Sequence, residues 1–95
     1  MYARVARFEG GDADVIRASA ESARGQSEPP EGVPAKGFLM LIDPEGGKGL
    51  GIVLFDTEED MRTGDAALAA MSPQPGAGER TSVEFYEVGA EVRAP

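Results

Sequence analysis

Two uninterrupted apolar runs constrain the fold of this chain more than any other feature. The runs are FLMLI, residues 38–42, and LGIVLF, residues 50–55, and the segment DPEGGKG separates them. Each run has the length of a β-strand, and neither alternates with polar residues. We therefore expect a β-hairpin whose strands are covered on both faces.

The segment between the runs could also be interpreted as a phosphate-binding loop, because it holds Lys48 among several glycines. A glycine-rich phosphate loop leads into a helix, whose N-terminal amides hold the anion, whereas GKGLG leads into a strand. A Walker loop also needs Ser or Thr after its lysine, and here Gly49 follows Lys48. We therefore predict a turn.

Gly49 and Gly51 need a separate explanation, because they lie two apart in the second strand and point to the same face. The missing side chains leave room for a helix, a partner chain or a ligand. We expect a helix or a partner subunit there. Gly64, inside a predicted helix, likewise indicates close packing against a neighbour.

Further elements flank the hairpin, and their periodicity identifies them. Asp12 is a candidate N-cap for the first helix, and Thr57 with Asp60 has the spacing of a capping box for the second. A loop rich in proline and glycine, residues 25–37, is either mobile or folded over a surface. The predicted elements are strands at 2–8 and 81–88, a helix at 15–24, and a helix that opens within 56–60 and carries the stripe Met61, Leu68 and Met71.

The predicted order is β-α-β-β-α-β, the ferredoxin-like α+β fold, with a four-stranded antiparallel sheet and two helices on one face. We predict a single domain over residues 1–90, which is long enough for one small core, and a C-terminal tail at 91–95. The helices cover only one face of the sheet, although both apolar runs indicate two covered faces. A second copy of the chain is the simplest cover, so we predict a homodimer.

Composition excludes several functions. The chain has no Cys and no His, which excludes disulfides, thiolate nucleophiles and histidine-based triads. The net charge of −8 opposes nucleic-acid binding. We expect the acidic run 56–60 to serve the helix dipole, and we predict no metal site. No leader or bilayer-length apolar run occurs, so we expect a cytoplasmic protein without a membrane partner.

Three segments, the opening YARV, the hairpin GFLMLIDPEGGKGLGIVLFDTEED and the closing VEFYEV, resemble the dimeric α/β-barrel superfamily. The resemblance covers residues 2–88 and is nearest to small proteins grouped with the antibiotic-biosynthesis monooxygenases. It implies two ferredoxin-like subunits with their sheets face to face, and a small-molecule cavity between sheet and helices or inside the barrel. Some members oxidise aromatic polyketides without metal or flavin, and others degrade haem. This chain has no His, Trp or Asn, residue types that those active subgroups place in their pockets, and we predict no cofactor.

The candidate ligand pocket joins the first and last strands, which are neighbours in a ferredoxin-like sheet. If the register permits, Arg4 and Glu84 are cross-strand or diagonal partners, and with Tyr2 or Tyr86 they form a polar cluster in an apolar cavity. The alternative is a structural ion pair or a solvated edge.

Two functional hypotheses follow from these patterns. One is a homodimeric barrel that binds a small hydrophobic or aromatic molecule, with cofactor-independent monooxygenation as its potential chemistry. The other is a non-catalytic ligand-binding or assembly protein. A pocket on which Tyr or Arg converges favours the first, and a cavity filled by Phe38, Met40 and Leu54 favours the second.

Overall fold

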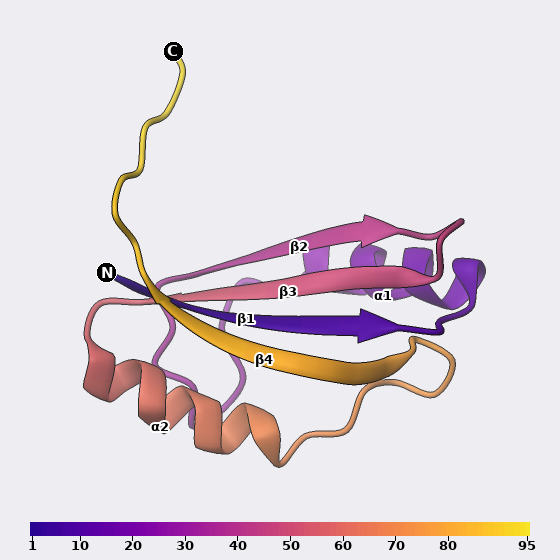
Figure 1. Cartoon of the computed structure of the whole chain (residues 1–95), viewed down its shortest axis with the longest axis horizontal. Helices are drawn as coiled ribbons and strands as arrows, with labels where there is room; N and C mark the ends of the chain where they lie inside the picture. Colours follow the sequence, from indigo (N-terminus) through magenta and orange to yellow (C-terminus); the bar gives the residue numbers. More distant parts are fainter.

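The computed structural model describes residues 1–95 and contains six elements in the predicted order (Figure 1). The four strands form one antiparallel sheet in the order β2-β3-β1-β4, which confirms the ferredoxin-like α+β fold. Neither helix is long and apolar enough to span a bilayer. The elements are β1 (Tyr2–Glu9), α1 (Ala13–Arg24), β2 (Gly37–Asp43), β3 (Lys48–Phe55), α2 (Glu58–Ala69) and β4 (Glu79–Glu87).

A tight turn joins β2 to β3, as the apolar runs predict. A carboxylate oxygen of Asp43 accepts a hydrogen bond from the Gly46 amide at 3.1 Å, and the Gly47 amide donates to the Pro44 carbonyl at 3.1 Å. Gly47 has φ 68°, a conformation that glycine adopts without strain. Asp43 then pairs with Lys48, so β3 begins two residues earlier than expected.

Side-chain caps begin both helices at the predicted residues. The Asp12 carboxylate accepts from the amides of Asp14 at 3.0 Å and Val15 at 3.2 Å. The Thr57 hydroxyl accepts from the Asp60 amide at 3.0 Å. Each cap satisfies amides that have no partner within the helix, and this fixes where the chain turns from strand to helix.

The end of α2 depends on a residue from another element. The helix stops at Ala69, before Met71, and its last turn contains no basic side chain. Arg80 of β4 supplies the missing cation, donating to the carbonyls of Leu68 and Met71 at 3.3 Å and of Ala69 at 3.1 Å. These bonds satisfy carbonyl groups at the negative end of the helix dipole.

The strand register divides the side chains between two faces of the sheet. Arg4 and Ala6 of β1 point toward the helices, and Val5 and Arg7 point to the opposite side, which we call the open face. In Figure 1, α1 lies behind the sheet and α2 lies below it, and neither helix covers the open face. Side chains from three adjacent strands form an apolar patch there: Val5, Leu39, Leu41, Leu50, Ile52 and Leu54.

The hydrophobic core lies between α2 and the Phe55 end of β3. Phe55 is fully buried and packs with Val53, Met61 and Val33. Val33 comes from the loop between α1 and β2, so this loop is folded into the core. A Cβ on Gly64 would lie 2.5 Å from the Phe55 ring, which confirms the close packing predicted for that glycine.

Candidate functional site

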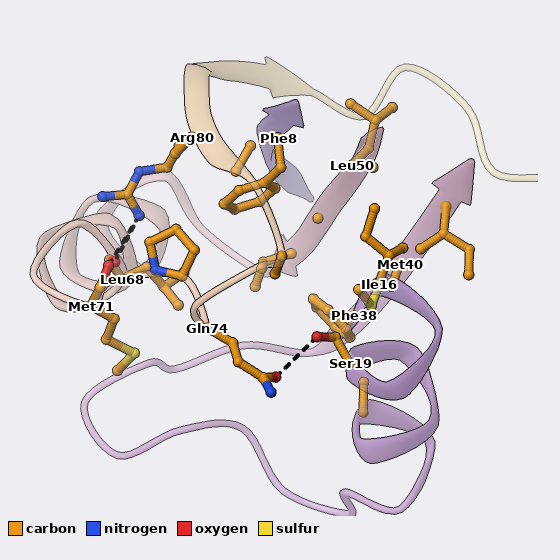
Figure 2. A pocket seen from close by; sticks show the side chains of 18 of the residues that line it. Phe8, Ile16, Ser19, Phe38, Met40, Leu50, Leu68, Met71, Gln74 and Arg80 are labelled. Atoms are coloured by element: carbon orange, nitrogen blue, oxygen red, sulfur yellow. Dashed lines mark hydrogen bonds between the residues drawn. The ribbon is translucent and has the colours of Figure 1, made fainter. Parts of the chain in front are cut away.

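A cleft of about 430 Å³ lies between the helix-covered face of the sheet and the two helices (Figure 2). It sits over the Gly49–Gly51 end of β3, whereas the core occupies the Phe55 end. Most of its wall is apolar and comes from both helices and the sheet. The large apolar side chains on the wall are Phe8, Ile16, Phe38, Met40, Ile42, Leu50, Leu68 and Met71.

The cleft is present because the sheet and α1 face each other there with small residues. Ala6, Gly49 and Gly51 supply little or no side chain from the sheet, and Ser19 and Ala23 face them from α1. Where both the helix and the sheet present such short side chains, the side chains do not fill the space between the two backbones. The cleft therefore forms where these short side chains from separate elements face one another.

The helix expected over the β3 glycines does not approach Gly51. A Cβ at this position would meet only the rings of Phe8 and Phe38 within 4 Å, each at 3.9 Å. Gly51 also points away from the open face, so a copy of the chain docked on that face would not touch it. Of the three explanations for the missing side chains, space for a ligand fits this geometry.

The mouth of the cleft is bridged by one hydrogen bond between α1 and the loop that follows α2. The Ser19 hydroxyl donates to the Gln74 side-chain carbonyl at 3.0 Å, and Figure 2 shows this bond crossing the opening. The Asp12 amide donates to the Gly76 carbonyl at 2.7 Å and holds the same loop against α1. Phe38 and Met71 are 53% and 41% exposed although both line the cleft, so it stays open to solvent beside the bridge.

The charged residues that line the cleft are both arginines, Arg4 and Arg80. The Arg4 side chain is 4% exposed, and its Nε donates to the Asp65 carboxylate at 2.8 Å. Its Nη2 is buried and has no hydrogen-bond partner. A buried donor without a partner costs about 1–3 kcal/mol, so Arg4 keeps unused hydrogen-bonding capacity at this position beside the cleft.

The register separates the four residues of the predicted pocket into two pairs. Arg4 lies opposite Phe85, and Glu84 lies opposite Val5, so Arg4 and Glu84 point to opposite faces and do not pair. Arg4 lines the cleft, and Tyr2, on the same face, packs against the core. The set Tyr2, Arg4, Glu84 and Tyr86 therefore does not converge within one chain.

On the open face, Glu84 and Tyr86 form their own pair. The Tyr86 hydroxyl donates to the Glu84 carboxylate at 2.7 Å. This hydrogen bond, together with the negative charge of Glu84, raises the pKa of Tyr86 above its ordinary value. Tyr86 therefore remains a neutral phenol at neutral pH and does not act as a base.

Replacing Glu84 with Gln is expected to lower the pKa of Tyr86, because the neutral amide removes the carboxylate charge. Tyr2 and Tyr86 are the two tyrosines of the chain, so a Tyr2→Phe background isolates the ultraviolet tyrosinate signal of Tyr86. Since the pKa is raised in the folded state, the pair's contribution to stability is present at neutral pH and lost as the pH rises through that pKa. An unchanged or higher ionisation midpoint in Glu84→Gln would contradict the assignment.

Several lining residues were not singled out by sequence reasoning. Arg80 lies just before the predicted last strand at 81–88, and only the lack of a basic residue in the last turn of α2 could have drawn attention to it. The non-catalytic hypothesis predicts a cavity filled by Phe38, Met40 and Leu54. Phe38 and Met40 line the cleft without filling it, and Leu54 lies on the open face.

Comparison of the chain with protein-family models, with curated proteins and with solved structures finds no match. The strand order and connections establish the ferredoxin-like fold on their own. Membership of the dimeric α/β-barrel superfamily stays a prediction.

Proposed function

We propose that this chain is a homodimeric α/β-barrel protein that binds a small hydrophobic or aromatic molecule in the cleft between its sheet and its helices. The observation that supports the proposal is the cleft itself, about 430 Å³ in volume, with a mainly apolar wall and few polar groups. Small-molecule sites in proteins have this size and composition. Phe8 and Phe38 flank the bare floor at Gly51, an arrangement that suits a flat ring system.

The open face supports the dimer. Leu39 and Leu41 are 53% and 46% exposed in the single chain, and they adjoin the apolar side chains of β3 and β1. Soluble monomers rarely expose a contiguous apolar patch of this kind. A second copy related by a two-fold axis would cover the patch with the same patch and form the barrel.

The lining residues bear on whether the protein is an enzyme. Cofactor-independent monooxygenation of the kind implied by the resemblance converts a substrate CH₂ group and O₂ into C=O and water, with every electron supplied by the substrate. The reaction begins when the substrate loses a proton to become an anion, whose oxygen a guanidinium can stabilise. No carboxylate, histidine or tyrosine lines the cleft, so the chain supplies no base there.

We therefore propose ligand binding as the primary function, and monooxygenation only for a substrate that ionises unaided. The non-catalytic alternative shares the binding and lacks the turnover. Oxygen consumption in the presence of the bound molecule separates the two.

Native mass spectrometry of the mildly purified chain tests both parts of the proposal. The expected species has twice the 9.9 kDa chain mass and carries a small-molecule adduct. Two adjacent residues on opposite faces of β3 provide matched variants. Gly51→Leu, which fills the cleft, should lose the adduct and keep the dimer, and Ile52→Asp, which places a charge on the open face, should give a monomer.

A wild-type monomer at micromolar concentration would refute the barrel. A wild-type dimer without an adduct, with no difference between wild type and Gly51→Leu, would refute the cleft as a binding site. The two parts of the proposal therefore fail separately.

A further inference from the structure

We infer that the ligand of the cleft is an organic anion, a flat apolar molecule whose negatively charged oxygen is bound by the guanidinium of Arg4. This inference rests on the proposed function, because it names the class of molecule that the same cleft takes. Its basis is the charge of the lining and the state of one buried side chain.

The charged residues that line the cleft are positive, whereas the protein as a whole is negatively charged. The chain has 17 acidic residues against 9 basic ones, yet no acidic residue lines the cleft, and both charged lining residues are arginines. A wall drawn at random from this composition would be acidic. Arginines in a recess with apolar walls attract anions more strongly than they would in open water.

Arg4 has hydrogen-bond donors that the protein leaves without a partner. Its guanidinium carries five N–H donors, and the carboxylate of Asp65 engages it through Nε alone. Nη2 is buried without a partner. In this conformation Nη2 has no surface open to solvent, so the proposal requires the guanidinium to turn toward the cleft while Nε keeps its bond to Asp65. An oxygen of a molecule in the cleft then supplies the missing partner.

The remaining charges favour an anionic oxygen over a neutral carbonyl. The Asp65 side chain is 34% exposed, so water shares its charge and it neutralises Arg4 incompletely. Arg80 donates to main-chain carbonyls and to no carboxylate, and adds a second positive charge to the wall. A charge-assisted hydrogen bond is roughly twice as strong as a neutral one, and Arg suits planar anionic groups.

Two kinds of molecule share this chemistry, an aromatic carboxylate and the enolate of a hydroxyquinone. Calorimetric titration of the wild-type dimer compares each anion with a neutral analogue of nearly equal shape. The pairs are naphthoate with naphthamide, and lawsone, which is ionised at neutral pH, with its methyl ether. We expect the anion of at least one pair to bind about tenfold tighter or more than its neutral analogue.

The outcomes separate this inference from the proposed function. If anions and neutral analogues bind equally well, the anion preference is overturned and the cleft remains a binding site. If none of the four molecules binds while the purified wild type carries a small-molecule adduct, the inference falls and the proposed function stands. If the wild type carries no adduct either, both fall. The pair that shows the preference identifies the carboxylate or the enolate as the recognised group.

A matched pair of variants then assigns the preference to Arg4. Arg4→Met should reduce the ratio of anion affinity to neutral-analogue affinity to about twofold or less. Arg7→Met removes the same charge from the same strand on the opposite face and should retain the full preference. A full preference in Arg4→Met, or a loss as large in Arg7→Met, would overturn the assignment, and the wild-type comparison stands even if Arg4→Met does not fold.

Discussion

Replacing Phe55 with Ala is expected to lower the free energy of unfolding by about 3–5 kcal/mol. Phe55, at the end of β3, is the largest fully buried side chain in the protein and part of its hydrophobic core. Its neighbour Gly64 has no side chain that could move into the vacated space. The loss is a large part of the roughly 5–15 kcal/mol that stabilises a typical domain.

Urea denaturation followed by circular dichroism measures this change, at one fixed protein concentration because dimerisation would contribute to stability. Phe85→Ala is the matched control. Phe85 is 47% exposed on the edge strand β4, and its loss should cost less than about 1 kcal/mol. Equal effects of the two substitutions would show that the core does not lie under α2.

Replacing Asp65 with Ala is expected to lower the free energy of unfolding by about 3 kcal/mol. The substitution leaves the positive charge of Arg4 buried without a counterion, and breaking a buried ion pair in this way costs about 3–5 kcal/mol. The Asp65 side chain is 34% exposed, which places the expected loss at the lower end of that range.

An exposed ion pair on the same helix provides the control for Asp65→Ala. Glu58 and Arg62 of α2 are 2.5 Å apart and well exposed, so Glu58→Ala should cost about 0.5 kcal/mol or less from the lost ion pair. The double substitution Arg4→Met with Asp65→Ala removes both charges and should recover part of the stability. A loss in Asp65→Ala no greater than in Glu58→Ala, without recovery in the double variant, would contradict the buried pair.

The elements and their order were predictable because their signals are local. Asp12 and Thr57 are N-caps whose side chains bond to amides within the next three residues. The Asp43–Gly47 turn is likewise specified by residues that contact one another. The apolar length of β2 and β3 identified two strands that a single layer of helices cannot cover on both faces.

The candidate site was predicted only in part, because it depends on register. Whether Arg4 faces Glu84 or Phe85 changes with a slip of one residue, and no local pattern in either strand fixes that slip. Val33 in the core illustrates the same limit. The burial of a valine within a proline-rich loop cannot be predicted from the loop sequence, because it depends on the contact of the loop with α2. The cleft arises where small residues from separate elements meet, so no single segment of the sequence indicates it.

β3 forms one wall of two different environments. Gly49, Leu50, Gly51 and Val53 border the cleft, whereas the side chains of Ile52 and Leu54, together with Leu50 by its register, lie on the face assigned to the partner subunit. On both proposals no residue from Gly49 to Leu54 is free to vary, since each substitution changes what the protein binds or what it assembles with. Neutral variation in this protein should therefore concentrate in the C-terminal segment, where Val92 is 91% exposed, and spare the hairpin.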